Sequence, residues 1–555
     1  MITAEELRSL PLFAALSSER LTSVSARAAD MDLQPGEYLV HEGESPGFFV
    51  ILDGTVEVTK RFGTLERVLG TRTRGDMFGE VPLILGAATF ANARAATRAR
   101  VMRLDGVTFN ELVRESPRVS AAVMESIALR IGDLERVTTE GPSQDAVIVG
   151  RRYDPACHDV RDFLARNQVR FDWFEPDDER LHERIPDAPA LIDRCPLVRT
   201  ASGQLLVQPT PRELACAIGL PVDPEHTDYD LVIAGGGPAG LAAAVYGASE
   251  GLRTLMVERE APGGQAGTSS RIENYLGFPG GLSGSDLGER ALLQAQRLGA
   301  EMVVTRNVIA IEPDGARHTV RLDGNDAVGA RAVLLANGVT WRRPPVEGID
   351  ALIGRGVYYG AARTEAIGTR GKDVYLLGGG NSAGQAALYF SDYARSVTLI
   401  VRSRSLDRTM SRYLVERIER RPDVFRVIEH GEVVAVEGAD HLRAIVVRAR
   451  DGAETRYATD SLFVFIGADP ETGWLPDTIL RDPDGYVLTG PELRRDERAR
   501  WPLERDPFLL ETSVPGIFAA GDVRHGSVKR VAAAVGEGSM AIAFVHQALP
   551  APDPA

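Results

Sequence analysis

The stretch YDLVIAGGGPAGLAAAVYGASEGLRTLMVERE, residues 229–260, decides the fold of this chain. An apolar run with strand character leads into Gly235, Gly237 and Gly240, and a helix of small residues follows. Gly235 permits a tight turn, Gly237 lets a phosphate approach the backbone, and Gly240 lets the helix pack closely on the strand. The segment therefore predicts a strand–turn–helix unit that binds a dinucleotide.

The residues around this turn strengthen that prediction. The helix opens at Pro238 and Ala239, where unpaired N–H groups and the positive end of the helix dipole favour an anion. Glu258 ends the next strand, where its carboxylate can accept hydrogen bonds from ribose hydroxyls. A tight turn without a nucleotide is the alternative, but strand, helix and terminal acid together argue against it.

A second unit of the same kind spans residues 373–406, DVYLLGGGNSAGQAALYFSDYARSVTLIVRSRSL. No acid follows its second strand. Arginines suit the 2′-phosphate of NADPH, whereas an acid would bind the 2′-hydroxyl of NADH, so NADPH is preferred and NADH stays possible. The alternative is that the two arginines are merely solvated. The predicted residues of this site are Gly378, Gly380, Asn381, Ser382, Ala383, Arg402 and Arg404.

Composition excludes several classes of protein. The 555 residues carry a net charge of −15 and only three cysteines, Cys157, Cys195 and Cys216. An acidic chain repels nucleic-acid backbones, and so few cysteines argue against a secreted disulfide scaffold. We see neither a signal peptide nor a membrane span, so we expect a cytoplasmic protein with no nucleic-acid or membrane partner.

Further motifs, in the same order along the chain, identify a family. They are PGGQAGTSSRIENYLGFP at 262–279, LLANGV at 334–339 and FAAGDVRHGSVKRVAAAVGEGSMA at 518–541. With the two glycine-rich units, these segments resemble the low-molecular-weight thioredoxin reductases. The resemblance implies FAD in the first unit, a nicotinamide cofactor in the second, and a homodimer whose two dinucleotide domains rotate against each other.

The resemblance also assigns FAD-binding residues beyond the first glycine turn. The helix opening near Arg530 would direct its N-terminus at the flavin, stabilising charge on the reduced ring. The implied residues are Gly264, Gln265, Asn274, Gly521, Asp522, Arg530, Val531 and Ala532.

The chain departs from that family where electrons would leave the flavin. The family carries C-x-x-C just before its second glycine-rich strand, but GVYYGAARTEAIGTRGKDVYLLGGGN at 356–381 places Gly360 and Arg363 there. Neither residue can form a dithiol, so we expect no thioredoxin reduction by the family's route. Transfer of hydride from the nicotinamide to the flavin needs only stacked cofactors and should survive.

Residues 145–220 have the predicted order β–α–β, β–β–α of a degenerate thioredoxin or glutaredoxin-like fold. In DPACHDVRDFL at 154–164, Asp154 replaces the first cysteine of the resembling C-P-Y-C motif and Cys157 keeps the second. A thiol at a helix N-terminus can have a lowered pKa. Cys195 precedes Pro196, the position of the family's cis-proline, so we hypothesise that Cys157 and Cys195 interact as candidate redox thiols. The alternative is two unrelated, partly buried cysteines.

The N-terminal block predicts an antiparallel β structure of jelly-roll type followed by a helix over 116–137. DGTVEVT at 53–59 and RGDMFGEVPLIL at 74–85 resemble a cyclic-nucleotide-binding domain. The resemblance implies Gly79 for the phosphate and Glu80 for the ribose. Thr89 stands where the family has its phosphate-binding arginine, and Arg94 is the next candidate. Tight binding of cAMP or cGMP therefore does not follow, and a role in dimerisation or docking is the alternative.

The fold class is accordingly multidomain: a β jelly-roll, an α/β thioredoxin-like domain and two Rossmann-type dinucleotide-binding domains, one of them discontinuous. The expected boundaries are 1–140, 145–220, 228–345 for the first part of the FAD domain, 346–465 for the NAD(P)H domain, and 466–550 for the second part of the FAD domain.

Two functions remain open at this point. The favoured one is an enzyme that passes electrons from NADPH through FAD to an unidentified small-molecule or redox-protein acceptor, regulated by the N-terminal domain and a small effector. The alternative is a flavin-binding sensor of redox or nucleotide state with little turnover.

Overall fold

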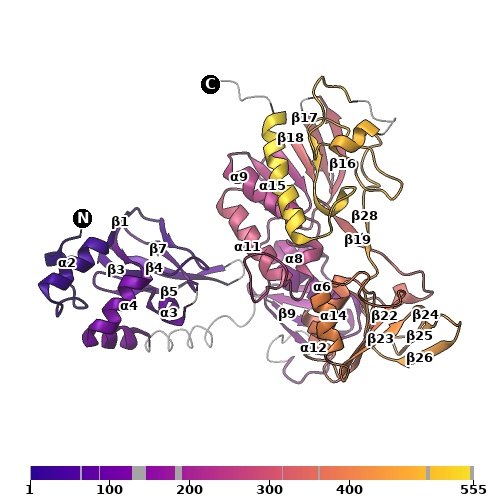
Figure 1. The fold of residues 1–555 in the computed structure, drawn as a ribbon, viewed down its shortest axis with the longest axis horizontal. Helices are drawn as coiled ribbons and strands as arrows, with labels where there is room; N and C mark the ends of the chain where they lie inside the picture. Colours follow the sequence, from indigo (N-terminus) through magenta and orange to yellow (C-terminus); the bar gives the residue numbers. More distant parts are fainter. Residues whose placement is uncertain are drawn as a thin grey trace. The chain divides into compact units, whose positions relative to one another are not determined.

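The computed structural model describes residues 2–62, 65–86, 88–127, 146–181, 185, 191–315, 317–360, 363–495 and 501–549, without the side chains at 61–67 and 363–364. It divides into two compact units, Met1–Ser143 and Gln144–Ala555, each described by itself (Figure 1). Of the helix predicted over 116–137, residues 117–127 are helical and the rest lie outside the described residues.

The N-terminal unit consists of two antiparallel four-stranded sheets, as the jelly-roll prediction requires. One sheet has the order β1 (Ala29–Leu33), β8 (Ala99–Leu104), β3 (Phe48–Asp53), β6 (Met77–Phe78). The other has the order β2 (Tyr38–Val40), β7 (Asn92–Ala95), β4 (Val56–Phe62), β5 (Leu65–Arg72). The helices are α1 (Ala4–Arg8), α2 (Ser18–Arg27), α3 (Glu80–Leu85) and α4 (Gly106–Glu115).

Strand β3 contributes side chains to both hydrophobic cores of the N-terminal unit. Its first five residues are all buried, because successive side chains point to opposite faces and both faces are covered. Phe48 and Val50 pack with residues of the helices, whereas Phe49 and Ile51 pack with residues of the second sheet. The apolar run FFVIL is therefore the centre of two small cores.

A middle α/β segment, residues 146–217, begins the second unit. Its sheet has the order β10 (Phe171–Phe174), β9 (Ala146–Val149), β11 (Leu197–Thr200), β12 (Leu205–Val207), with β10 parallel and β11 antiparallel to β9. The helices are α6 (Pro155–Arg166), η2 (Ile192–Arg194) and α8 (Pro211–Ala217). The chain order β–α–β–β–β–α is the predicted one, and the Cys195–Pro196 peptide bond is cis.

The first dinucleotide sheet is built around β13 (Asp228–Ala234). Parallel neighbours extend it on both sides: β14 (Thr254–Val257), β15 (Glu301–Val303), β18 (Ala327–Leu335) and β29 (Ile517–Ala519). Beyond β18 lie the antiparallel strands β17 (Arg317–Leu322) and β16 (Val308–Asp314). Helices on this domain are α9 (Pro238–Ser249), α10 (Gly264–Gly267), α11 (Gly284–Arg297), η4 (Gly490–Arg495), η5 (Gly521–Val523) and α15 (Val531–Ala548).

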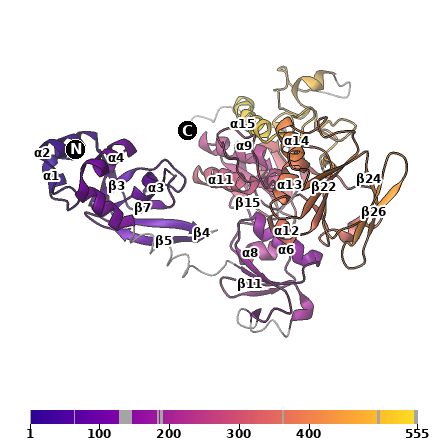
Figure 2. The same ribbon diagram turned by 60° about the horizontal axis from the view of Figure 1, so that its bottom comes forward.

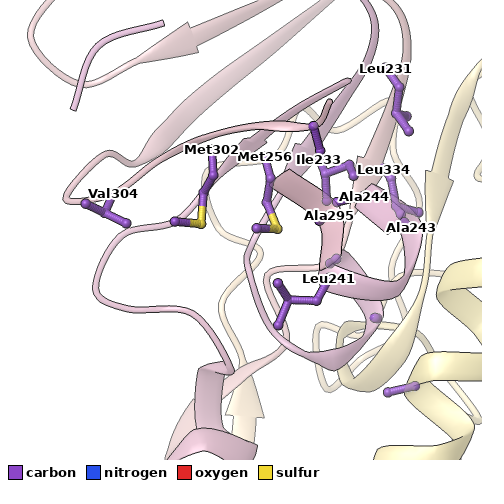
Figure 3. Packing of buried hydrophobic residues seen from close by; sticks show 14 of the residues in the cluster. Leu231, Ile233, Leu241, Ala243, Ala244, Met256, Ala295, Met302, Val304 and Leu334 are labelled. Carbon is purple, nitrogen blue, oxygen red and sulfur yellow. The ribbon is translucent and has the colours of Figure 1, made fainter. Parts of the chain in front are cut away.

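Both faces of this sheet are buried, which is typical of parallel strands covered on each side. Leu231 and Ile233 of β13 pack in the same cluster as Leu241 of α9 and Leu334 of β18 (Figure 3). Val232, between them in sequence, belongs to a separate cluster on the opposite face. The apolar run LVIA is therefore a central strand with two buried faces.

The second dinucleotide sheet is entirely parallel, with the order β20 (Val357–Tyr359), β27 (Leu462–Val464), β21 (Asp373–Leu377), β22 (Ser396–Val401), β23 (Phe425–Glu429). An antiparallel sheet of β24 (Glu432–Glu437), β25 (Ala444–Arg448) and β26 (Glu454–Ala458) follows. The helices are η3 (Ile349–Leu352), α12 (Arg363–Gly368), α13 (Asn381–Phe390) and α14 (Arg412–Glu419).

Two antiparallel strands, β19 (Val339–Trp341) and β28 (Ala468–Pro470), pair where the chain leaves the first dinucleotide domain and returns to it. The two Rossmann-type domains of the prediction are therefore present, the first of them discontinuous. Among the described helices, none is both long and apolar enough to cross a membrane.

Candidate functional site

One large cleft, of about 1370 Å³, joins the two glycine-rich units. Much of its wall comes from both sides of the first dinucleotide domain, and residues of α13 in the second complete it. The predicted residues in the wall are Gly235, Gly237, Pro238, Ala239, Glu258, Gly264, Gln265, Asn274, Asn381, Ser382, Gly521, Asp522, Arg530 and Val531. The predicted residues Gly240, Gly378, Gly380, Ala383, Arg402, Arg404 and Ala532 lie outside this wall.

The first turn is closed by the carboxylate of Glu258. The Gly236 N–H donates to Oε2 over 2.7 Å and the Glu260 N–H donates to Oε1 over 2.8 Å. Burial raises the pKa of Glu258, and these two backbone hydrogen bonds act in the opposite direction. The carboxylate is thus fixed at the mouth of the turn by two backbone N–H groups.

The glycines of the first turn have different surroundings. A Cβ on Gly240 would overlap the carbonyl oxygen of Gly235, so this glycine allows the close packing of helix on strand. A Cβ on Gly237 would meet nothing within 4 Å, which leaves its backbone open to a ligand. Gly240 therefore supports the turn from behind, and Gly237 faces the cleft.

The segment after Glu258 folds back onto the same turn. The Gly263 N–H donates to the Gly236 carbonyl over 2.8 Å, and Gly264 has a φ of +52°, in the left-handed region. The amide Nε2 of Gln265 donates to the carbonyl of Val339, at the start of β19. Gln265 is thereby held between the first dinucleotide domain and the strand that leaves it.

The C-terminal motif forms the remaining part of the wall. Gly521, with a φ of +75°, donates its N–H to Glu537 over 2.7 Å. Burial raises the pKa of Asp522, and Lys529 Nζ donates to the Asp522 carbonyl over 2.7 Å. Helix α15 begins at Val531 after Arg530, so its N-terminus opens at the cleft.

The second glycine turn has the same construction. Gly378 has a φ of +141°, and a Cβ there would overlap the Phe465 carbonyl oxygen. Gly380 precedes α13 and has open space where a Cβ would stand. Asn381 accepts a hydrogen bond from the Ser411 N–H over 2.7 Å, so its side chain is held in place by the backbone ahead of α14.

The remaining predicted residues of the second unit lie away from the cleft. Ala383 is fully buried beneath the turn. Arg402 and Arg404 are exposed just beyond the end of β22.

Where the resembling family has its first redox cysteine, this chain has Gly360 with a φ of +88°. A Cβ there would lie 3.3 Å from Thr268 Oγ1, and Thr268 and the neighbouring Tyr359 both line the cleft. The Tyr359 hydroxyl is buried without a hydrogen-bond partner among the described residues. The side chain of Arg363 lies outside the described part of the chain. Thr268 and Tyr359 form this point of the wall, and Gly360 beside Thr268 carries no thiol.

The middle α/β segment lies against the second dinucleotide domain at α12, beside α6 (Figure 2). His158 Nδ1 and Glu365 Oε1 are 3.0 Å apart, and Arg152 donates to the Gly368 carbonyl over 2.7 Å. Burial lowers the pKa of His158, but the hydrogen bond to Glu365 and the negative charges of Glu365 and Asp162 together outweigh it, and the pKa is raised. This contact covers the helix that follows the missing dithiol.

The other end of α6 contacts the first dinucleotide domain. Arg166 pairs with Glu260, and Asn167 Nδ2 donates to the Glu260 carbonyl over 3.1 Å. Arg166 also lines the cleft. The sequence did not predict the contacts of Arg166 and His158. Their partners are about a hundred or more residues away in the chain, and no local motif indicates such a contact.

The structure corrects the expectation for Cys157. Its thiol is fully buried, and burial, with Asp154 nearby, raises its pKa to about 12. The pKa of Cys195 is also raised by burial. The prediction that the helix N-terminus stabilises a Cys157 thiolate is wrong, because the Asp154 carboxylate caps the helix and the Cys157 sulfur lies in the core. Both cysteines are free.

The N-terminal pocket contains only part of the predicted cyclic-nucleotide set. Gly79 and Thr89 line it, whereas Glu80 and Arg94 do not. Glu80 is fully buried and accepts a hydrogen bond from the Ser126 hydroxyl over 3.0 Å. Arg94 pairs with Glu57 over 3.0 Å, because it sits on β7 in register with that β4 residue. Glu80 and Arg94 therefore do not line this pocket.

Taken together, two parallel glycine-turn domains around one cleft define a protein of the two-dinucleotide-domain oxidoreductase class. Residues 229–538 match the family described as "Pyridine nucleotide-disulphide oxidoreductase", and this chain belongs to that family. Residues 31–116 match the family described as "Cyclic nucleotide-binding domain".

Proteins similar to this chain include two bacterial thioredoxin reductases. The chain is 35% identical over 317 residues to the thioredoxin reductase of Treponema pallidum. This alignment covers 57% of this chain and 95% of that protein. It is 32% identical over 321 residues to the thioredoxin reductase of Listeria monocytogenes, covering 57% and 92%. Among solved structures, the thioredoxin reductase of Lactococcus lactis in its FR conformation aligns with a TM-score of 0.51 at 28% identity, covering 58% of this chain and 99% of the other.

Proposed function

We propose that the chain is an FAD-dependent NAD(P)H oxidoreductase in which electrons pass from NADPH to FAD and then to an acceptor reached without an adjacent dithiol. The observation that carries this proposal is the single cleft lined by both glycine-turn helices, α9 and α13. A bound flavin supplies a two-electron carrier between nicotinamide and acceptor. The chain's residues supply binding, orientation and electrostatics.

The residues of the cleft fit an FAD. The volume of the cleft exceeds the 300–1,000 Å³ usual for small-ligand pockets. An extended dinucleotide requires a cleft of this larger size. Gly237 leaves room for a pyrophosphate, and the Asn337 Oδ1 atom is buried in the wall without a partner among the described residues. We propose that Glu258 binds the ribose, that Gly521 and Asp522 bind the ribityl and pyrophosphate, and that Gln265 and Asn274 lie along the ring.

The start of α15 has a defined electrostatic role in this proposal. The helix runs for 18 residues from Val531, so the positive end of its dipole faces the cleft at Arg530 and Val531. Negative charge gained by the flavin on reduction would be stabilised there. Lys529, whose amine contacts the Asp522 carbonyl, adds a cation to the same end.

The nicotinamide cofactor is assigned to the second turn. Gly378, Gly380, Asn381, Ser382 and Ala383 form its phosphate-binding helix start. Arg402 and Arg404, exposed beyond β22, would bind the 2′-phosphate and favour NADPH over NADH.

The acceptor is the part of the proposal that differs from the family. Gly360 offers no thiol beside Thr268 of the cleft wall, and Cys157, with its pKa raised to about 12, is a poor substitute because a buried thiol is inert. We propose a small acceptor, such as a quinone, that enters the same cleft. The middle segment, which we propose is a degenerate thioredoxin-like domain of residues 145–220, then has a structural role against α12.

A second candidate function is a redox sensor with little turnover. It is favoured by the contacts of α6 with both dinucleotide domains, through Glu260 on one side and Glu365 on the other. Such contacts would restrict the rotation that turnover requires in the resembling family.

Anaerobic stopped-flow mixing of the FAD-loaded protein with NADPH or NADH tests the proposal. We expect fast bleaching of the flavin absorption, faster with NADPH, and rapid reoxidation by a short-chain benzoquinone. Bleaching slower than minutes would favour the sensor. Reoxidation by oxidised thioredoxin as fast as by the quinone would contradict the acceptor assignment.

A further inference from the structure

The N-terminal β domain contains a pocket that is independent of the large cleft. It has a volume of about 120 Å³ and is lined by residues of strands β2 to β7 and of α3. Its wall is mainly apolar, and Phe49, Phe78 and Phe90 contribute aromatic rings. Phe49 and Phe78 stack with their centroids 4.9 Å apart, and Phe90 is 38% exposed. The pocket is therefore an apolar chamber with an aromatic side.

The side chains that would bind a cyclic nucleotide lie outside this chamber or have hydrogen bonds within the protein. The Thr89 hydroxyl donates to the Glu44 carbonyl over 3.0 Å. The Glu80 carboxylate accepts from Ser126 and lies outside the wall. The Asn92 Oδ1 atom accepts the Glu42 N–H over 2.8 Å. A cyclic phosphate placed here would find no arginine at position 89, and the ribose would find no carboxylate.

One charged side chain lines the chamber: Arg72, at the end of β5. One of its terminal nitrogens, Nη1, donates to the Thr71 carbonyl over 3.0 Å. Its Nε–H is buried and has no hydrogen-bond partner among the described residues. A buried donor without a partner loses the free energy of its hydration, so an acceptor supplied by a ligand would be favourable.

The volume limits what that ligand can be. An engineered apolar cavity of about 150 Å³ binds benzene, so a chamber of about 120 Å³ has room for no more than one six-membered ring, and a charged substituent must extend from the ring toward Arg72 in the wall. A purine with ribose and cyclic phosphate is far larger. A planar carboxylate matches the guanidinium of an arginine, which presents its N–H donors in a fixed fork.

We propose that this pocket binds a small aromatic or similarly compact apolar carboxylate, with the ring among Phe49, Phe78 and Phe90 and the carboxylate on Arg72.

Isothermal titration of the full-length, FAD-loaded protein with benzoate tests this site. Benzamide keeps the ring without the charge, acetate keeps the charge without the ring, and cAMP represents the family's ligand. We expect benzoate to bind at least ~10-fold more tightly than benzamide or acetate, and cAMP not to displace it. Tighter binding of cAMP than of benzoate would overturn the proposal, and so would equal binding of benzoate and benzamide.

Substitution of the arginine gives the second arm. Arg72→Leu should weaken benzoate binding about 10- to 100-fold, the usual range for loss of a hydrogen bond to a charged partner. The control is Arg74→Leu, because Arg74 is exposed, two residues further on, and outside the wall. Arg72→Lys should retain part of the affinity, because it keeps the positive charge. Unchanged binding in Arg72→Leu, or an equal loss in Arg74→Leu, would contradict the assignment.

Discussion

The large cleft and the N-terminal pocket offer different kinds of groups to a ligand. In the cleft, turns and helix starts supply most of the groups that would contact a dinucleotide, and Glu258 is held in place by two backbone N–H groups. In the N-terminal pocket, the fold is retained while Thr89 and Glu80 have their hydrogen bonds within the protein. A site made by backbone therefore keeps its ligand class as long as the fold persists, whereas a site made by a few side chains can change it.

The strongest test of the backbone-made site uses two glycines of α15. A Cβ on Gly538 would overlap the Ala239 carbonyl of α9, whereas a Cβ on Gly536 would meet nothing within 4 Å. Gly538→Ala should lower the free energy of unfolding by about 2–3 kcal/mol and reduce FAD content. Gly536→Ala should be neutral or stabilise by up to about 1 kcal/mol. Thermal unfolding and the flavin-to-protein absorbance ratio measure both, and equal behaviour of the two variants would refute the packing argument.

The next prediction concerns Glu258, whose carboxylate accepts two backbone hydrogen bonds at the first glycine turn. Glu258→Gln should weaken FAD binding about 10- to 100-fold, because an amide cannot accept from both backbone N–H groups and the ribose as a carboxylate does. Equilibrium dialysis of the apoprotein against FAD measures the change. Glu250→Gln, an exposed change on the same domain, is the control and should leave the affinity unaltered. Normal FAD affinity in Glu258→Gln would place the ribose elsewhere.

Cofactor preference gives a smaller effect in the second turn. Arg402→Leu with Arg404→Leu should raise the KM for NADPH about 10-fold and leave that for NADH nearly unchanged, since only NADPH carries the 2′-phosphate. Steady-state rates with both cofactors measure this split. The exposed Arg420→Leu serves as the control, and a parallel rise of both KM values in the double variant would count against the two arginines.

The smallest effect is a pH dependence at the contact of α6 with α12. The folded-state pKa of His158 lies above its unfolded value, so the folded state binds this proton more tightly. The stability it contributes is fully present below about pH 6.5 and is lost as the pH rises through the folded pKa. His158→Gln should therefore destabilise the protein by about 1 kcal/mol at pH 5.5 and by less at pH 9. Urea unfolding at both pH values measures this, and an equal cost at the two pH values would exclude the charged pair with Glu365.

The sequence predicts what local rules determine. Gly235, Gly237 and Gly240 have the surroundings that their spacing implies, and strand and helix follow in the expected order, because turn and packing requirements act over a few residues. The N-terminal sheets and the cis bond at Pro196 also match the expectation. Placing Arg166 in the cleft wall and Arg72 in the pocket requires tertiary contacts, which carry no local signal. The lowered pKa predicted for the Cys157 thiol was wrong. Burial raises this pKa more than the helix N-terminus lowers it, and the sequence alone does not show that the thiol is buried.

An anaerobic titration of the FAD-loaded protein with NADPH, followed at the flavin absorption band, tests the central claim most directly. With no redox-active dithiol beside the flavin, bleaching should be complete near one equivalent of NADPH per FAD. No bleaching, or bleaching that is complete only after a second equivalent, would contradict it.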